Sequence, residues 1–402
     1  MTNYLFILKP QKKGKRFLLV VPYSYPDFSG SGRNAFNLGK FLAKRKIPVR
    51  LLTFNRGLRY KRTEYKEGLY IYRIAYLNKN LFLKIISLLW ILPLYIFRIL
   101  KSDIIYVFGV NIIAWQFIIL FSNICGKKVI LRSLILYEDD IETLISKSNY
   151  LTRILNRNLI RFINCYFSIH PGFSDSYVKV IGNRIRLLEM PQGVDPDLFH
   201  PVSSDEKKIL RKKLGLPENE FIIISVAFLI NRKGFGEIFE QLQLLKFPFQ
   251  FLIIGEYDFD KCHFLSKLQS ESLILRQKGS EFLGSTLKFT GPKENINEYI
   301  QSADVCLFNS KAEGLPNSML EAMASGKVVI CNHIAGLEGY LLHHKENSLI
   351  FSDILDLNSK IVSIYNDPEL RTSIGINASK TIDNLATFDL VLNRIFSALE
   401  IE

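Results

Sequence analysis

Apolar segments of strand length alternate with amphipathic helical segments along most of the chain, and this alternation constrains the fold more than any other feature. One series begins at Arg16 and continues to about residue 170, and a second begins at Phe221 with the run FIIISVAFLI. Strands that alternate with helices are typical of parallel sheets, whose strands are apolar throughout because helices cover both faces. The sequence therefore predicts an α/β fold with two doubly wound parallel sheets.

The chain length and a change in composition both indicate two domains. A single core rarely extends over 402 residues, and the segment 191–206 between the two series is rich in Pro, Asp and Ser, as linkers are. We expect a first domain over residues 1–200, a second over 201–380 and a terminal helix over 381–402 that crosses back to the first domain. The positive charge belongs to the first half, because residues 1–200 carry a net charge of +19 and the remainder −5, which together give +14.

The segment EGLPNSMLE at residues 313–321 lies where an apolar strand is followed by a helix. Pro316 suits the first turn of that helix, and Asn317 and Ser318 suit its cap, which leaves backbone N–H groups at the positive end of the helix dipole. A diphosphate fits this position. The two glutamates that frame the segment would repel a phosphate, so we expect them to accept hydrogen bonds from hydroxyls of a sugar or ribose.

This segment resembles the signature of the family-4 retaining glycosyltransferases of GT-B fold, in which seven residues separate two glutamates at a strand, turn and helix. The resemblance implies two Rossmann-like domains that face a central cleft, with Glu313 against the transferred sugar and Glu321 against the ribose of the nucleotide. It assigns the distal phosphate of the donor to the residues Gly314, Leu315, Pro316, Asn317 and Ser318. By spacing alone, the two glutamates also fit a capped helix with two surface carboxylates.

A basic turn at residues 231–234 (Asn-Arg-Lys-Gly) ends a strand of the second series, at the edge where open α/β sheets bind ligands. The resemblance assigns Lys233 to the departing diphosphate, so Lys233 and Glu313 are the expected catalytic residues. The family commonly has an arginine five positions earlier, where Phe228 stands here, and Arg232 is the candidate substitute. A solvated basic turn is the alternative.

The first half supplies candidates for the opposite wall of the cleft. Gly30 and Gly32 follow a strand and precede a helix, and they resemble the family's glycine loop that touches the donor phosphates. The candidates for acceptor binding at strand ends are Arg132, Asp139 and His170. Asp139 and Asp140 fit equally well an acidic pair at a helix N-terminus.

No metal or other cofactor is expected. Asp258 and Asp260 form the Asp-x-Asp pattern that holds a divalent metal in another glycosyltransferase class, but an acidic surface loop is the favoured interpretation. None of the six histidines has the spacing of a metal-ligand pair. The basic residues lack a recognised nucleic-acid module, so nucleic acid is not an expected partner.

The segment 81–100 is apolar nearly all round, and its uncharged run is too short to cross a bilayer. It fits either a helix in the interface of an anionic membrane, with Trp90, Tyr95 and Phe97 as anchors, or a buried crossover helix. The N-terminal apolar stretch precedes a basic run, the wrong order for a secretory signal, and the five cysteines are scattered. We therefore expect a cytoplasmic protein, peripheral on the inner face of the membrane.

The sequence predicts a retaining glycosyltransferase that moves a sugar from a nucleotide-diphosphate sugar to an acceptor, a lipid-linked or surface-polysaccharide glycan. The GT-B fold also hosts a nucleotide-sugar epimerase and phosphorolytic enzymes, and both stay open as alternatives. A catalytically silent, membrane-associated scaffold of the same fold is a third.

Overall fold

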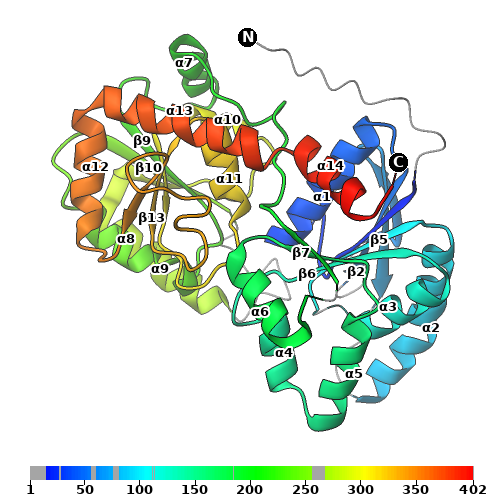
Figure 1. Ribbon diagram of the computed structural model, residues 1–402. Helices are drawn as coiled ribbons and strands as arrows, with labels where there is room; N and C mark the ends of the chain where they lie inside the picture. Colours follow the sequence, from blue (N-terminus) through cyan, green and yellow to red (C-terminus); the bar gives the residue numbers. More distant parts are fainter. Residues whose placement is uncertain are drawn as a thin grey trace.

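The computed structural model describes residues 15–401, except 27–28, 56–59, 76–80, 111, 113, 184 and 256–267. Two α/β domains lie side by side, each built on a sheet with helices on both faces (Figure 1). The first sheet has eight strands in the order β3-β4-β2-β1-β5-β6-β7-β8, and the second has six in the order β11-β10-β9-β12-β13-β14. The predicted fold class, two parallel-sheet α/β domains, is confirmed.

The elements of the first domain follow the predicted alternation. Its strands are β1 (Phe17–Val20), β2 (Val49–Asn55), β3 (Thr63–Lys66), β4 (Leu69–Ala75), β5 (Ile104–Phe108), β6 (Lys128–Arg132), β7 (Cys165–Ser168) and β8 (Arg186–Glu189). Its helices are α1 (Gly30–Lys44), α2 (Leu81–Leu100), α3 (Trp115–Ile124), α4 (Ile141–Lys147), α5 (Tyr150–Ile160) and α6 (Pro171–Ile181).

The second domain repeats the pattern after α7 (Ser204–Lys213), which begins with a capping box between Ser203 and Glu206. Its strands are β9 (Phe221–Val226), β10 (Phe249–Ile254), β11 (Leu287–Phe289), β12 (Val305–Phe308), β13 (Val328–Asn332) and β14 (Leu349–Phe351). Its helices are α8 (Phe235–Leu242), α9 (Gln269–Leu283), α10 (Ile296–Ser302), α11 (Asn317–Ala324), α12 (Asp356–Asn366), α13 (Pro368–Leu385) and α14 (Phe388–Ala398).

The apolar character of β9 follows from its position in the centre of the second sheet. Ile222 and Ile224 belong to the buried cluster that includes α10 and α11, whereas Ile223 belongs to the cluster formed with α8, α9 and α12. Both faces of the strand are therefore buried, as expected for a parallel sheet covered on both sides.

The order of the strands determines where a ligand can bind. Strand β9 pairs in parallel with β10 on one side and with β12 on the other, so the chain reverses its direction of winding between them. The loops that follow β9 and β12 leave the same sheet edge at this switch point, which is where open α/β sheets bind ligands. These two loops carry the basic turn at 231–234 and the segment 313–321.

Three details differ from the sequence-based expectations. Strand β3 was not predicted, and it pairs antiparallel with β4 in a hairpin, so the first sheet is mixed. The short strands β8 and β14 were also missed. The amphipathic segment 140–163, which the alternation alone would make a single helix, forms two helices, because the chain is extended at Ser148 and Asn149. The Asn149 side chain accepts a hydrogen bond from Thr152 N–H and caps α5.

Helix α2 has a buried side and an exposed side, and Tyr95, expected as a membrane anchor, lies on the buried one. The membrane-interface interpretation of the segment 81–100 stays a prediction. One side is buried in the core through Ile91, Tyr95 and Ile99, while Leu89 and Phe97 on the other side are 71% and 47% exposed. Burial therefore explains the apolar residues on one side of α2 and leaves those on the exposed side unexplained. None of the described helices is both long enough and apolar enough to span a bilayer.

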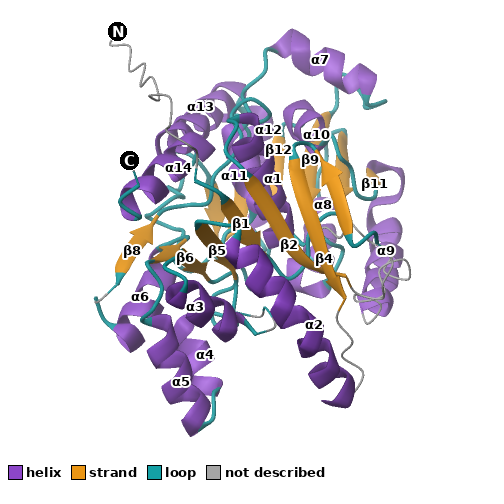
Figure 2. Ribbon diagram, turned by 90° about the vertical axis from the view of Figure 1, so that its right-hand side faces the viewer, coloured by secondary structure: helices purple, strands orange, loops and turns teal. Residues whose placement is uncertain are grey.

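The last helix, α14, packs on the first domain, next to β8 (Figure 2). Val194 and Thr387 form a β-bridge, and Phe388 packs on Phe41 with ring centroids 5.2 Å apart. At Gly193 a Cβ atom would lie 2.3 Å from Phe388 Cδ1 and 2.9 Å from its Cα. Glycine at this position therefore allows the close approach of the two segments.

We expect Gly193→Ala to lower the free energy of unfolding by about 1–3 kcal/mol, because the methyl group must displace the backbone of α14. Gly236→Ala is the matched control, since its Cβ would meet only the flexible end of Lys278 at 3.3 Å. That control should leave stability unchanged or raise it by up to about 1 kcal/mol. Urea unfolding measures both changes, and equal stabilities for the two variants would contradict the packing described.

Candidate active site

The basic turn after β9 and the glutamate after β12 meet at the switch point of the second sheet. The amine of Lys233 donates a hydrogen bond to the carboxylate of Glu313, and Nη1 of Arg232 lies 3.6 Å from the same Oε1 atom. Arg232 also donates to the backbone carbonyl of Ala312, which anchors it to the strand–helix connection. The structure thus brings together the two predicted catalytic residues and the predicted second cation.

This ion pair is largely withdrawn from water. The side chains of Lys233 and Glu313 are 16% and 10% exposed, and Arg232 is 34% exposed. Burial lowers the pKa of Lys233, and the neighbouring Glu313 carboxylate acts in the opposite direction. A cation in such surroundings interacts more strongly with an incoming anion than a solvated lysine does. The alternative of a solvated basic turn does not describe Lys233.

Helix α11 begins at Asn317, with Pro316 as its N-cap in an extended conformation. The expectation that Pro316 occupies the first turn and that Asn317 and Ser318 cap the helix is therefore wrong. Their side chains bond elsewhere: Asn317 Nδ2 donates to the carbonyl of Gly30 at 2.6 Å, and Ser318 Oγ donates to that of Val226 at 3.0 Å. The first N–H groups of a helix have no intrahelical acceptor, so this end can still bind an anion.

The strand–helix connection also touches the first domain directly. At Gly314 a Cβ atom would lie 2.1 Å from the carbonyl oxygen of Leu134 and 3.1 Å from Ile169 Cδ1. Gly30, on the α1 N-terminus, faces Asn317 through the hydrogen bond just described. The predicted donor residues of both domains are therefore in contact.

The surroundings of Gly32 explain why glycine stands there, and its expected contact with the donor phosphates stays a prediction. Its Cβ would lie 1.8 Å from the carbonyl oxygen of Tyr23, and its N–H donates to Ser29 Oγ at 3.0 Å. The need for glycine here arises from packing within the first domain.

A buried polar chain connects this region to the centre of the first sheet. Gln192 Nε2 donates to the carbonyl of Leu315 at 2.8 Å and to Asn317 Oδ1, and its Oε1 accepts from Arg132 Nη2 at 2.5 Å. Arg132 Nη1 donates to Asn34 Oδ1 at 3.0 Å. Sequence reasoning missed Gln192, which lies in the segment treated as a linker. Arg132, predicted at the acceptor site, is connected through Gln192 to the segment 313–321.

Glu321 is buried, with a side chain 6% exposed, and its Oε1 lies 3.8 Å from Arg33 Nε. Burial raises the pKa of Glu321. It lines a small cavity of about 10 Å³ between the domains, together with Asn34, Asn37 and Asp195. With Glu313 buried as well, the alternative of two surface carboxylates is wrong. Their assignment to sugar and ribose stays a prediction.

Asp139 and Asp140 lie between β6 and α4, and they have different surroundings. Oδ1 of Asp139 accepts hydrogen bonds from the N–H groups of Leu134 and Ile135 at 2.8 and 2.7 Å, and no described residue bonds to its Oδ2. Burial raises the pKa of Asp139 to about 6. Asp140 is the N-cap of α4, which its neighbour is not. The helix-terminus interpretation therefore applies to Asp140 alone.

His170 is fully buried and caps α6, where its Nδ1 accepts from Gly172 N–H at 3.2 Å. Because Nδ1 is an acceptor, the proton of the neutral ring is on Nε2, for which the described residues provide no partner. Burial lowers the pKa of His170 to about 4. At neutral pH the Nε2–H group of His170 can donate a hydrogen bond to a ligand. The same nitrogen cannot act as a base, because it already carries the proton. Gly336 of the second domain packs against the ring, another contact that sequence reasoning missed.

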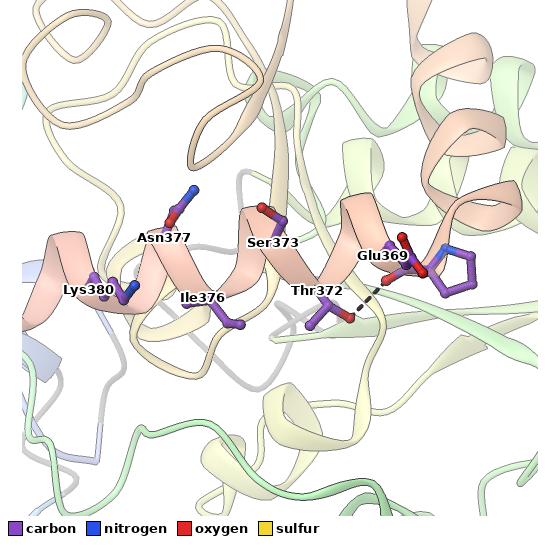
Figure 3. A pocket seen from close by; sticks show the side chains of 7 residues that line it. Glu369, Thr372, Ser373, Ile376, Asn377 and Lys380 are labelled. Atoms are coloured by element: carbon purple, nitrogen blue, oxygen red, sulfur yellow. Dashed lines mark hydrogen bonds between the residues drawn. The ribbon is translucent and has the colours of Figure 1, made fainter.

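Other parts of the structure supply little to the site. The described residues contain no group of three His, Cys, Asp or Glu side chains able to hold a metal, and Asp258 and Asp260 lie outside them. A hollow of about 560 Å³ lies on α13 (Figure 3), and neither Lys233 nor Glu313 lines it. One helix provides its whole lining: Pro368, Glu369, Thr372, Ser373, Ile376, Asn377 and Lys380.

Residues 206–381, which include the basic turn and the segment 313–321, match the family model described as Glycosyl transferases group 1. The chain is 26% identical over 251 residues to N,N'-diacetylbacillosaminyl-diphospho-undecaprenol alpha-1,3-N-acetylgalactosaminyltransferase of Campylobacter jejuni, covering 58% of this chain and 62% of that protein. It is 27% identical over 226 residues to alpha-monoglucosyldiacylglycerol synthase of Acholeplasma laidlawii, covering 54% and 53%. The matches thus span less than two thirds of these relatives.

Solved structures resemble the whole chain in fold. Sucrose-phosphate synthase from Thermosynechococcus elongatus has a TM-score of 0.71 at 18% identity, over 96% of this chain and 99% of that one. HepE from Anabaena in complex with UDP-glucose has a TM-score of 0.71 at 17% identity, with the same coverage. At these identities the likeness concerns the fold alone.

Asp139 and Asp140 allow a test of the electrostatics with opposite expected signs. Because the pKa of Asp139 is raised to about 6 from 3.8, its contribution to stability is present below the unfolded value and is lost as pH rises through about 6. Asp139→Asn should therefore raise the free energy of unfolding at pH 7 by about 1–3 kcal/mol, and the gain should vanish below about pH 4.

The neighbouring substitution is the control. The pKa of Asp140 is lowered by its hydrogen bonds, although burial opposes them, so its contribution is present at neutral pH and is lost as pH falls. Asp140→Asn should then destabilise the protein at pH 7. Urea unfolding of both variants from pH 4 to 7.5 measures the effect, and a shift of the same sign for both would contradict the two environments.

Proposed function

We propose that this protein transfers a sugar from a nucleoside-diphosphate sugar to a glycan acceptor. The proposal starts from two findings: residues 206–381 match the family model of the group 1 glycosyl transferases, and the two domains have the GT-B fold. Transfer retains the anomeric configuration and needs no metal ion. The observation that supports this most is the buried contact of Lys233 with Glu313 at the switch point, beside the N-terminus of α11. The arrangement supports the proposal because a cation and free helix N–H groups can together stabilise a departing diphosphate.

The proposed mechanism is electrostatic. The bond between the anomeric carbon and the diphosphate oxygen breaks, and the negative charge that develops on the diphosphate is stabilised by Lys233, Arg232 and the first N–H groups of α11. Glu313 accepts hydrogen bonds from sugar hydroxyls, and it holds Lys233 in position before the donor arrives. The acceptor oxygen attacks the same face of the sugar, and its proton passes to the leaving phosphate oxygen.

The donor and acceptor classes are supported by names of similar proteins. HepE was solved with UDP-glucose, and the name of the Campylobacter relative contains a diphospho-undecaprenol carrier. The Acholeplasma relative is named for a diacylglycerol product. We therefore propose a uridine-diphosphate sugar as the first donor class to test and a lipid-linked glycan as acceptor, with the protein peripheral on the cytoplasmic face of a membrane.

Binding and turnover can be separated experimentally. Calorimetry with UDP and GDP should show binding of one of them, and a silent scaffold would bind neither. Incubation with UDP-sugars should release UDP slowly without acceptor and faster with lipid-linked acceptor. Conversion of the sugar to its epimer without acceptor would instead indicate the epimerase alternative, and consumption of a glycan with inorganic phosphate would indicate a phosphorolytic enzyme.

Substitutions at the ion pair test the mechanism. Lys233→Ala should lower kcat by on the order of a hundredfold or more, because one preorganised charge at the leaving group is lost. Glu313→Gln should reduce kcat strongly as well, while it keeps the size of the side chain. Glu321→Gln should chiefly weaken binding of the nucleotide, by on the order of tenfold.

Lys311→Ala is the matched control for the lysine, because Lys311 is close in sequence to Glu313 but is 64% exposed and pairs with Glu237 at 3.1 Å. Its kcat should stay within about twofold of the wild type, since exposed ion pairs contribute little. Thermal unfolding establishes that all variants fold. Turnover of Lys233→Ala close to that of Lys311→Ala would remove the proposed mechanism.

A further inference from the structure

Three helices at one end of the first domain expose apolar side chains that no part of the described structure covers. Helix α3 packs against both α2 and α5, and in both views these helices lie at the end of the domain far from α7 and α13 (Figures 1 and 2). We call their exposed apolar residues the α2–α3–α5 surface. It consists of Leu89, Trp90, Leu94, Phe97, Leu100, Leu120, Ile124, Tyr150, Leu151, Ile154 and Leu155.

Helix α5 shows the feature most clearly. Tyr150, Leu151, Ile154 and Leu155 recur at the spacing of one helix face and are 73%, 76%, 43% and 52% exposed. Its polar residue Asn156 is buried, where its Oδ1 accepts a hydrogen bond from Gln116 Nε2 at 3.2 Å. The usual arrangement of a surface helix, polar outside and apolar inside, is thus partly reversed. Single exposed apolar residues are common in proteins, but a repeated face is not.

The three helices carry charges of one sign only. None of the three helices contains an Asp or Glu, whereas α2 carries Arg98 and α5 carries Arg153 and Arg157. Exposed lysines flank them at Lys101 and Lys147. An apolar face with basic residues at its margins is complementary to a bilayer whose headgroups are anionic, because the apolar residues enter the interface and the cations stay at the headgroups.

We propose that the α2–α3–α5 surface docks on an anionic lipid bilayer, with the tip between α4 and α5 in contact with the membrane. The docking itself does not depend on catalysis, but its purpose rests on the proposed function, since a lipid-linked acceptor is confined to the membrane. Helix α4 joins the two regions: it begins directly after Asp139 and Asp140 and ends two residues before α5. The loop of the predicted acceptor site is therefore connected through one short helix to the docking surface.

Flotation with vesicles tests the inference on the full chain. The wild type should float with vesicles of phosphatidylcholine and phosphatidylglycerol at low salt and less with phosphatidylcholine alone. The double variant Leu151→Asp, Leu155→Asp should partition at least about tenfold less, because charged groups do not enter the interface. Lys147→Gln and Arg157→Gln should each weaken binding to the anionic vesicles about fivefold.

A matched double variant on the second domain provides the control. Leu273 and Ile274 on α9 are 50% and 65% exposed, and Leu273→Asp, Ile274→Asp should float as the wild type does. Equal flotation of the α5 and α9 variants would overturn the proposal, as would failure of the wild type to bind anionic vesicles. So would a wild-type dimer that the α5 variant converts to monomers, since a second copy would then cover the surface.

Nucleotide binding distinguishes this inference from the proposed function. The α5 variant should bind the nucleotide diphosphate with unchanged affinity, because its substitutions are exposed and outside the donor site. A wild type that binds the nucleotide but no vesicles would overturn the membrane-docking proposal and leave the proposed enzyme function intact. Vesicle binding without nucleotide binding would overturn the proposed enzyme function and leave the membrane-docking proposal intact.

Discussion

The contact between the segment 313–321 and the first domain is the interaction on which the site depends. Gly314 can approach the carbonyl of Leu134 only without a side chain, and Asn317 then reaches both Gly30 and Gln192. Arg132 is 3% exposed and bonds to two neutral side-chain oxygens, Asn34 Oδ1 and Gln192 Oε1. A buried guanidinium needs acceptors, and Gln192 is the one that links Arg132 to the second domain, because its amide donates to Leu315 and Asn317. Separation of the domains would remove the partners of Gln192 in the segment 313–321, so the contact reaches Arg132 through this side chain.

The site is divided between the two domains, and this division affects how a nucleotide-sugar donor would bind. The helix end, the buried pair of Lys233 and Glu313, and Glu321 all belong to the second domain, whereas Gly30 and Arg33 come from the first. A nucleotide bound to the second domain alone would leave its phosphates open to solvent. In this structure the first domain already contacts the segment 313–321, which excludes water there and lowers the local dielectric. A lower dielectric strengthens the attraction between a cation and a developing negative charge.

The sequence predicted the alternation of strands and helices, the switch-point position of Lys233 and the special nature of residues 313–321, because these depend on local periodicity and short motifs. It failed where a distant partner decides the outcome. Asparagine is a common residue at helix caps, but the hydrogen bonds of Asn317 to Gly30 and Gln192 across the domain interface override that preference. Gln192 was assigned to a linker, and Gly336 was not noticed, because neither carries a local signal of the interface it joins.

The exposed side of α2 also could not be predicted from the sequence, because the sequence does not show which apolar residues of a helix face solvent. From the sequence, an apolar helix fits either a buried or a membrane-facing position. The structure shows that Tyr95 faces the core while Leu89 and Phe97 face outward, so the helix has two apolar sides. Helix α5 looks ordinary in sequence because it is fairly polar, but it exposes Leu151 and Leu155 because the side that packs on α3 carries Asn156, which bonds to Gln116. Which apolar residues reach the surface is thus decided by the rotation of each helix against its neighbours, and that rotation is a tertiary property.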